Sequence, residues 1–264
     1  ISVIMLNKTF KKLENLRKRL KEGKSITSAW MQLSNTNLTE LICLAKFDCI
    51  TFDFEHGVFS TKDLPDHFRV VEMHNKLPLV RLPSKNLEIS SQCLDAGAAG
   101  IIIPNVKNYK ELKKIITFIN LPPHGTRGVG YSRANRFGKY FKDFINKQRK
   151  PFVVAMIESI DSVKGIKKIL SVKGLDAILI GPYDLSASMK ITGKFEHKKF
   201  IAIIEKIKRE SNFFKIPCGI HVVEANFNKL KEYDNKGFKF LPYGIDTEIF
   251  NKSLSNIFKL KRTK

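Results

Sequence analysis

The sequence has few of the features that mark a secreted or membrane protein. Its four cysteines, Cys43, Cys49, Cys93 and Cys218, are scattered along the chain and form no CxxC pair. That spacing fits reduced thiols in a core better than disulfides or a zinc site. No apolar run reaches the roughly 18 to 20 residues that cross a bilayer, and the first residues do not have the pattern of a signal peptide. We therefore expect a cytoplasmic protein without a membrane segment.

Acidic residues are also scarce, which leaves the chain strongly basic. Of 264 residues, 47 are lysine or arginine and 25 are aspartate or glutamate, a formal net charge of +22. Such a charge is typical of proteins that bind nucleic acid or anionic surfaces. However, 37 of the basic residues are lysine, whereas recognition of base edges depends on the planar fork of arginine. The lysines are spread along the chain rather than gathered in one stripe, so we interpret the charge as a solvated surface that attracts anionic substrates and do not expect nucleic acid as a partner.

Short apolar runs alternate with helical patterns along the whole chain. The expected strands are 25–30, 49–54, 78–82, 100–103, 152–157, 175–180, 217–221 and 238–242, and helices are expected at 86–96, 108–119, 159–170, 198–211 and 223–236. Eight evenly spaced strands with no GxGxxG after the first favour a (β/α)8 barrel over a doubly wound sheet. We predict one domain over 1–264, with an amino-terminal helix at 8–22 before a barrel at 25–264.

The longest stretch without periodicity is 121–150, which contains the run LPPHGTRGVGYSRANRFG. A loop of this length in a compact domain usually has a function, and it often acts as a lid. We expect it to form part of the active site.

Unusual polar residues stand at the ends of the expected strands, where barrel enzymes hold their active sites. In the run FVVAMIES, alternation places Phe152, Val154, Met156 and Glu158 on one face, so Glu158 would project into the barrel mouth. Asp184 follows the next strand. Either carboxylate alone could serve only as a helix cap, but together they can share a hard divalent cation such as magnesium, manganese or cobalt.

Two further side chains fit the same chemistry. His56, after the second strand, could move the proton of a substrate hydroxyl near neutral pH. Arg81, in the third strand, could stabilise an enolate oxygen. Either residue could instead be structural, since a lone histidine often is and a lone arginine often pairs with a carboxylate.

Several motifs together resemble a known family. The runs FDFEHG, VRLP, LDAGAAGIIIP, PPHGTRGVG, MIES and GPYDLS occur in the order and spacing of the 4-hydroxy-2-oxoheptanedioate aldolases, over residues 25 to 250. That group belongs to the HpcH/HpaI aldolase and citrate lyase superfamily. The resemblance implies a class II, divalent-metal-dependent pyruvate aldolase, which reversibly cleaves a 4-hydroxy-2-oxo acid to pyruvate and an aldehyde through a metal-stabilised enolate.

The resemblance also assigns roles residue by residue. It implies that Glu158 and Asp184 bind the metal, that His56 is the catalytic base oriented by Asp95, and that Arg81 faces the keto oxygen of pyruvate. In the segment Gly181, Pro182, Tyr183 and Asp184, the amides of the last two residues resemble those that hold the substrate carboxylate. Trp30 matches a pocket wall, and Asp53 and Glu55 match positions that support the waters around the metal.

The sequence departs from the family pattern at two places. Met156 stands where many members have glutamine, so one polar contact is lost, and His221 stands where an apolar residue is expected in the aldehyde pocket. We expect His221, together with the loop from Arg127 to Arg136, to favour a hydroxylated or anionic acceptor. The loop arginines could instead tie a neighbouring subunit.

Alternatives remain open from the sequence. A neighbour in the superfamily could act on a thioester, as malyl-CoA or citryl-CoA lyases do, and a protein of another class could be a non-catalytic barrel that binds anions or nucleic acid. The resemblance further implies a homohexamer in which the last helix, expected near 247–260, is exchanged between subunits. Its apolar stripe is Ile249, Phe250, Leu254, Ile257 and Phe258.

Overall fold

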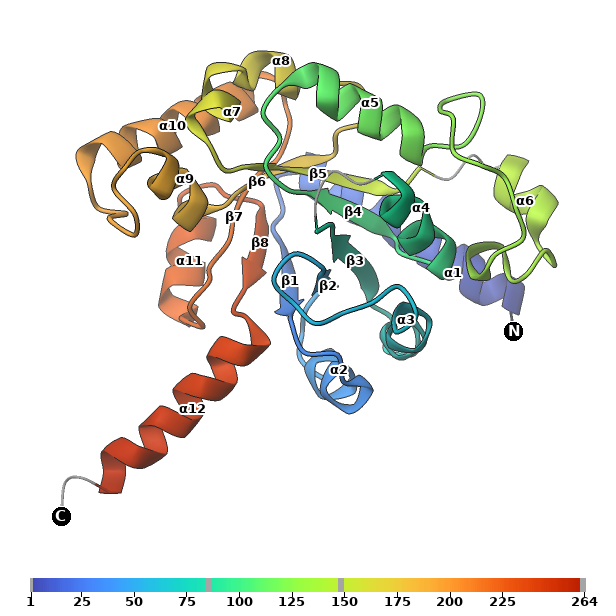
Figure 1. The fold of residues 1–264 in the computed structure, drawn as a ribbon, viewed down its shortest axis with the longest axis horizontal. Coiled ribbons are helices and arrows are strands. Elements are labelled where there is room, and N and C mark those ends of the chain that lie inside the picture. Colours follow the sequence, from blue (N-terminus) through green and yellow to red (C-terminus); the bar gives the residue numbers. More distant parts are fainter. Residues whose placement is uncertain (1, 84–86, 147–149, 262–264) are drawn as a thin grey trace.

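Eight parallel strands form a closed barrel in the computed structural model, which describes residues 2–83, 87–146 and 150–261. Each strand pairs with the next along the chain, and the last pairs with the first (Figure 1). The strands are β1 (Ile26–Met31), β2 (Cys49–Asp53), β3 (Leu77–Arg81), β4 (Gly100–Ile103), β5 (Phe152–Ile157), β6 (Ala177–Ile180), β7 (Cys218–Ile220) and β8 (Phe240–Tyr243). The predicted (β/α)8 barrel is confirmed, and its strand bounds differ from the prediction by at most a few residues.

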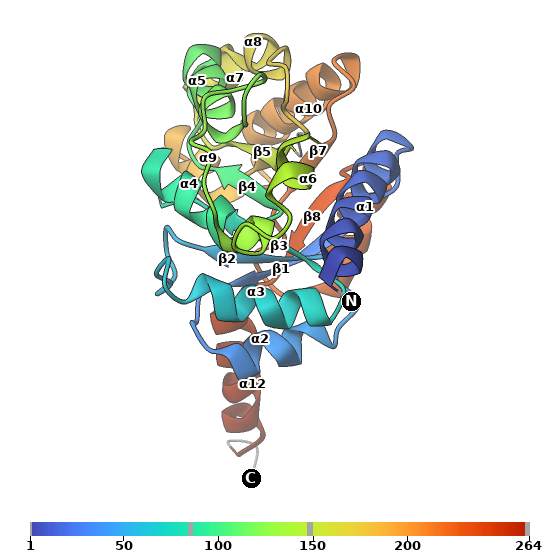
Figure 2. The same cartoon turned by 90° about the vertical axis from the view of Figure 1, so that its right-hand side faces the viewer.

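Helices surround the barrel on its outer side (Figure 2). They are α1 (Ser2–Lys21), α2 (Thr36–Cys43), α3 (Leu64–Met73), α4 (Leu87–Ala96), α5 (Tyr109–Ile119), α6 (Phe141–Asn146), α7 (Ile160–Lys164), α8 (Ile166–Leu170), α9 (Pro182–Ser188), α10 (Lys198–Phe213), α11 (Phe227–Asn235) and α12 (Asp246–Lys261). The single helix predicted at 159–170 is divided into α7 and α8 at Gly165, whose ψ of 4° departs from helical geometry. No helix in these described ranges is long and apolar enough to cross a membrane.

The helix α1 covers the amino-terminal end of the barrel. Its apolar face, with Leu13, Leu16 and Leu20, belongs to the same buried cluster as side chains that point into the barrel. On its polar side, Arg17 donates to Asp176 at 2.7 and 2.9 Å and to the carbonyl oxygen of Pro151 at 2.8 Å. The predicted amino-terminal helix therefore exists and closes one end of the barrel.

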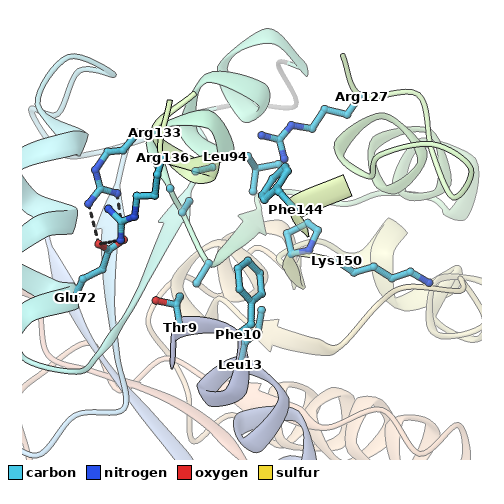
Figure 3. A pocket seen from close by; sticks show the side chains of 15 residues that line it. Thr9, Phe10, Leu13, Glu72, Leu94, Arg127, Arg133, Arg136, Phe144 and Lys150 are labelled. Atoms are coloured by element: carbon cyan, nitrogen blue, oxygen red, sulfur yellow. Dashed lines mark hydrogen bonds and ion pairs between the residues drawn. The ribbon is translucent and has the colours of Figure 1, made fainter. Parts of the chain in front are cut away.

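The described residues of the segment 121–150, which are 121–146 and 150, lie at this same end. The segment follows α5 and precedes β5, and it contains a short 3-10 helix, Arg133–Asn135, besides α6. Arg133 and Arg136 both bind the carboxylate of Glu72 on α3, at 2.9 and 3.2 Å, beside a small cavity that also borders α1 (Figure 3). A segment between a helix and the following strand lies at the amino-terminal ends of the strands, so the prediction of a lid over the active site of its own barrel is wrong.

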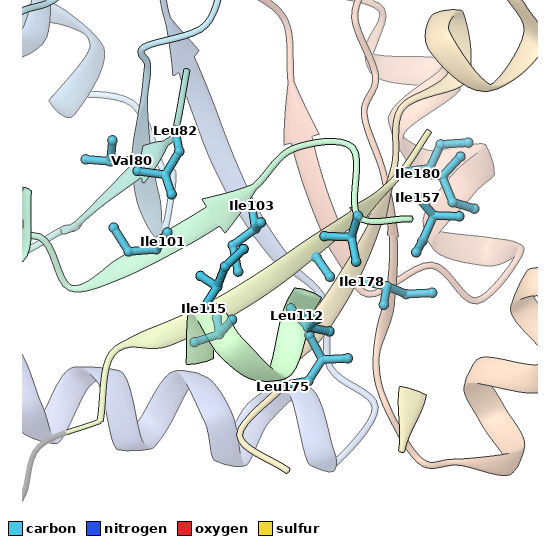
Figure 4. Packing of buried hydrophobic residues seen from close by; sticks show 14 of the residues in the cluster. Val80, Leu82, Ile101, Ile103, Leu112, Ile115, Ile157, Leu175, Ile178 and Ile180 are labelled. Atoms are coloured by element: carbon cyan, nitrogen blue, oxygen red, sulfur yellow. The ribbon is translucent and has the colours of Figure 1, made fainter. Parts of the chain in front are cut away.

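The core consists of two layers. Alternate residues of β5 point inward, with Phe152, Val154 and Met156 in the cluster inside the barrel. The residues between them point outward, where Ile157 and its neighbours on other strands pack against helices such as α5 through Leu112 (Figure 4). The alternation predicted for the fifth strand is therefore confirmed, and it directs Glu158, the next residue in the inward row, to the carboxyl-terminal mouth.

The last helix leaves the barrel after its first turn. Asp246 at its start accepts hydrogen bonds from the backbone N–H groups of Gln32 and Leu33, at 2.9 and 3.0 Å, which anchors α12 to the end of β1. The rest of α12 projects away from the barrel (Figures 1 and 2). Its exposed apolar side chains are Ile249, Phe250, Leu254 and Ile257, while the side chain of Phe258 lies outside the described residues.

Candidate active site

Arg81 occupies the centre of the carboxyl-terminal mouth of the barrel. It ends β3 and is only 5% exposed. Its guanidinium group lies 3.4 Å from Asp53 and 3.4 Å from Glu158, and it also forms an ion pair with Glu55. Its Nε is buried and has no hydrogen-bond partner among the residues described. The parallel strands thus bring these four predicted site residues together, with three carboxylates around the guanidinium group of Arg81.

Asp53 organises the turn that follows β2. Its Oδ1 accepts the backbone N–H groups of Glu55 and His56, at 2.9 and 3.2 Å, and its Oδ2 accepts the indole N–H of Trp30 at 3.0 Å. Burial alone would raise the pKa of Asp53, but Arg81 and these hydrogen bonds together hold that pKa below its usual value. Asp53 is therefore an ionised acceptor that fixes the backbone at His56.

Glu158 lies beside the start of α9. Its Oε2 accepts the backbone N–H of Asn105 at 2.6 Å, and its carboxylate rests against Gly181, where an added Cβ would come within 2.8 Å of Oε1. Burial raises the pKa of Glu158 to about 7, although Arg81 opposes the shift. Only glycine at position 181 lets this carboxylate approach the first turn of α9.

Asp184 stands in that first turn and is exposed. Its charge adds to the effect of burial in raising the pKa of both Glu158 and Glu55. Carboxylates that repel one another at a barrel mouth suit a divalent cation, which would neutralise them. Among the described residues no group of three or more His, Cys, Asp or Glu side chains is placed to hold a metal, so Glu158 and Asp184 would leave coordination positions to water and substrate.

An aromatic pair forms one wall of the site. The ring of His221, at the end of β7, lies against Trp30 with centroids 4.5 Å apart. Its Nε2 lies 3.2 Å from the carbonyl oxygen of Gly244, and a carbonyl can only accept, so Nε2 carries the hydrogen. Burial lowers the pKa of His221 to about 4, so the ring is neutral at physiological pH. The residue predicted to border the aldehyde pocket therefore lies in the site.

The two remaining predicted catalytic groups lie apart. His56 is exposed at the turn after β2. Asp95, on α4, is half-exposed, and Arg127 donates to its carboxylate at 2.5 Å. In the described contacts Asp95 thus pairs with the segment at the amino-terminal end of the barrel rather than with His56.

Two residues that contribute to the site were missed from the sequence. Asn105 adopts a left-handed conformation after β4, with φ of 44°, and presents its N–H to Glu158. The only available signal was an asparagine directly after a proline at a strand end, which is typical of a turn. Gly57 has no room for a side chain, since a Cβ would lie 2.3 Å from the carbonyl oxygen of Asp53. The sequence shows the glycine, but it does not show this close approach of the two backbone segments.

The arrangement of a buried glutamate, an aspartate after the next strand and an arginine beside the glutamate can be compared with known proteins. Residues 27–253 match the HpcH/HpaI aldolase/citrate lyase family. The chain belongs to this family. It is therefore a lyase of the aldolase and citrate lyase type, as the sequence motifs predicted.

Individual relatives agree with this assignment. The chain is 32% identical, over 89% of its own length and 89% of the relative, to a 4-hydroxy-2-oxo-heptane-1,7-dioate aldolase of Escherichia coli. An HpcH/HpaI aldolase from Desulfitobacterium hafniense superposes with a TM-score of 0.86 at 27% identity, covering 93% of this chain and 95% of that one. A Mycobacterium tuberculosis protein solved with magnesium and acetoacetate has a TM-score of 0.56 at 13% identity, covering 89% of each chain, and shows a common fold only.

Proposed function

We propose that the protein is a divalent-metal-dependent aldolase that reversibly cleaves a 4-hydroxy-2-oxo acid to pyruvate and an aldehyde. The observation that carries the proposal is Arg81, whose guanidinium group lies between Asp53 and Glu158 and keeps a buried Nε without a partner. A guanidinium group held in this way at the strand ends suits a substrate oxygen that gains negative charge. The relative from Escherichia coli is named for a substrate of this class.

The metal would be held by Glu158 and Asp184, with magnesium, manganese or cobalt as the candidates. The donor set consists of carboxylate oxygens, which these hard cations prefer, and the repulsion between the carboxylates would be relieved. When bound, the cation would polarise the keto group of the substrate and so stabilise negative charge that develops on the neighbouring carbon. The magnesium complex of the more distant Mycobacterium tuberculosis protein supports a divalent cation for this fold.

In the cleavage direction, His56 would accept the proton of the 4-hydroxyl group. The bond between carbons 3 and 4 then breaks, its electrons move into the pyruvate fragment, and the hydroxyl carbon becomes the aldehyde. Arg81 would donate to the keto oxygen as this negative charge develops. Protonation of carbon 3 completes the release of pyruvate, and addition to an aldehyde follows the same steps in reverse.

Other residues would position the substrate. Gly181 and Pro182 begin α9. The backbone amides of Tyr183 and Asp184 in its first turn have no partner within α9 and would bind the substrate carboxylate. Trp30 and His221 would form the wall on the aldehyde side.

Asp53 and Glu55 would support the site through their contacts with Arg81. The role of Asp95 in orienting His56 stays a prediction, and within this chain the Asp95 carboxylate pairs with Arg127 instead.

The test is release of pyruvate from a panel of 4-hydroxy-2-oxo acids, with magnesium, manganese or cobalt and after exhaustive chelation. We expect turnover only with the cation present. Borohydride reduction in the presence of pyruvate should leave no covalent adduct, because none of the eight strands ends in a lysine. Full turnover after chelation would contradict the proposal, and cleavage of citryl-CoA or malyl-CoA in its place would assign the site to a thioester lyase.

We also propose that the protein is a homo-oligomer, a hexamer by resemblance, in which α12 packs on a neighbouring subunit. The support is the projection of α12 from its own barrel with an exposed apolar face (Figure 1). A solitary exposed stripe of this kind is typical of a surface that is buried in an assembly.

A further inference from the structure

We propose that Lys229 selects aldehyde acceptors that carry a terminal anionic group, a carboxylate or a phosphate. The lysine would act in a subsite between the loops that follow β6 and β7. This rests on the proposed aldolase function and specifies its acceptor class. It also replaces the arginine segment 127–136, which the sequence suggested for this task and which lies at the opposite end of the barrel.

A small cavity lies between these two loops and next to the site. Tyr183, at the start of α9, and His221, at the end of β7, form one part of its lining, and Lys229 and Tyr233 of α11 form another. The His221 ring also packs against Trp30, with centroids 4.5 Å apart, so the cavity borders the wall of the active site. An acceptor bound beside Trp30 would therefore extend toward this cavity.

A wider groove between α10 and α11 adjoins the cavity. This groove has a volume of about 770 Å³, and both spaces are lined by Phe195, Lys229 and Tyr233. A volume of this size lies within the range of small-molecule sites. A phosphate as well as a carboxylate therefore has space beside Lys229.

Lys229 presents an available positive charge at the junction. Its Nζ lies 5.7 Å from the centre of the Phe195 ring, and that ring packs edge-on against Tyr183, with centroids 5.0 Å apart. An aromatic ring positions a cation without neutralising it. Within the described side chains, no carboxylate lies within ion-pair distance of Lys229. Glu224 lines the same cavity but is exposed, so water and salt screen its charge. Glu196, Glu205 and Glu232 belong to the lining of the wider groove.

His221, which separates the cavity from Trp30, adds no charge. Burial lowers the pKa of His221 to about 4, which leaves a neutral ring whose Nε2 hydrogen points to Gly244. His221 thus contributes shape, and Nδ1 as an acceptor. Discrimination between charged and uncharged acceptors falls to Lys229.

The experiment measures aldol addition of pyruvate to two matched pairs of acceptors, 4-oxobutanoate against butanal and glyceraldehyde 3-phosphate against glyceraldehyde. In Lys229→Met, the ratio of kcat/KM for the charged over the uncharged member should fall about tenfold, the size expected for a lost hydrogen bond to a charged group. Lys229→Arg should keep most of the preference. The two pairs show whether carboxylate, phosphate or both are selected.

The matched control is Lys231→Met, on the same helix. Lys231 is exposed, and its Nζ lies over the ring of Phe227, so the substitution removes the same charge at a site away from the cavity. The proposal predicts an unchanged ratio in this variant. A ratio that falls equally in both variants, or that stays at the parent value in Lys229→Met, overturns the subsite.

Failure of the subsite can be distinguished from failure of the aldolase assignment. Exchange of the methyl protons of pyruvate with solvent deuterium requires enolisation but no acceptor. A parent protein that exchanges these protons while Lys229→Met keeps the parental ratio contradicts the subsite alone. A parent without metal-dependent exchange or cleavage contradicts the aldolase function on which the subsite rests.

Discussion

A single guanidinium group faces three carboxylates at the mouth of this barrel. Arg81 lies 3.4 Å from both Asp53 and Glu158 and pairs with Glu55 as well. Its planar, forked donors can face separate partners in a way that the point charge of an ammonium group cannot. The identity of this residue as arginine therefore matters as much as its charge.

We predict that Arg81→Lys lowers kcat for pyruvate release about 100-fold, the size typical of removing one donor from a developing oxyanion. Metal affinity should change much less, because the lysine keeps a positive charge near Glu158 and Asp184. Steady-state kinetics and calorimetric titration with manganese would separate the two effects. An unchanged kcat would exclude Arg81 from contact with the reacting oxygen.

Glu158 makes stability depend on pH in the metal-free protein. Its pKa is raised to about 7, so between its usual value near 4.5 and pH 7 the folded state binds more protons than the unfolded state. Stability from this group is therefore greatest at low pH and falls as the pH rises through 7. We predict that Glu158→Gln gains stability relative to the parent over this interval, by a few degrees in Tm.

Thermal unfolding of the two proteins at pH 5 and pH 8, after chelation, would check this prediction. Addition of manganese at pH 8 should reverse the order, since the cation binds the parent carboxylate and stabilises the fold. A parent and variant with the same pH profile would show that the carboxylate is not a buried charge.

The sequence predicted the convergence of these residues for a simple reason. Parallel strands bring their carboxyl ends to one edge, so Asp53, Arg81 and Glu158 had to meet once the barrel was assumed. The supporting contacts could not be predicted in the same way. The amide of Asn105 and the space left by Gly181 depend on turn conformations that residue type alone does not specify.

At the scale of elements, α12 differs from the other long helices in having no barrel surface beneath most of its length (Figure 1). Its first turn is fixed by Asp246, while its apolar side chains face solvent. Burial of each of these side chains against a partner surface would therefore contribute favourable free energy to association.

We predict that Phe250→Asp dissociates the oligomer, because Phe250 is 64% exposed in the single chain and a charge would be buried at the interface. Asn251→Asp is the control, since it adds the same charge on the adjacent exposed position. Sedimentation equilibrium of both variants and the parent provides the measurement. A parent that sediments at the mass of one chain would refute the exchange of α12.

The position of segment 121–150 was the main error at this scale, and its cause is physical. The sequence showed a long loop after the fourth strand, but α5 intervenes and returns the chain to the amino-terminal end. Counting the helix before the loop would have placed Arg127 and Arg136 there. Lys229 was missed for the opposite reason, because a lysine among 37 carries no signal until a cavity is found beside it.

At the scale of the whole molecule, the two ends of the barrel have different tasks. The carboxyl-terminal end gathers Arg81, Glu158 and Asp184, while the amino-terminal end is covered by α1 and by segment 121–150 with its pairs to Glu72. Such a division is typical of barrel enzymes, in which one face carries chemistry and the other stability.

We predict that Leu16→Ala lowers the free energy of unfolding by about 2 to 5 kcal/mol, because Leu16 is 3% exposed within the cluster at the amino-terminal end. Glu14→Ala, on the exposed face of the same helix, should have little effect. Urea denaturation followed by fluorescence would compare them. Equal stability of Leu16→Ala and the parent would show that α1 does not close the core.

The pairing of β1 with β8 has a consequence for how the chain is made. The first strand to leave the ribosome is joined to the last, through contacts such as the N–H of Ile26 with the carbonyl oxygen of Lys239 at 2.8 Å. Until residues near 243 emerge, β1 has one unsatisfied edge, and such an edge can pair with another chain. A chain cut short before β8 would therefore keep an open sheet with an unpaired edge at β1, and that edge is a site of aggregation.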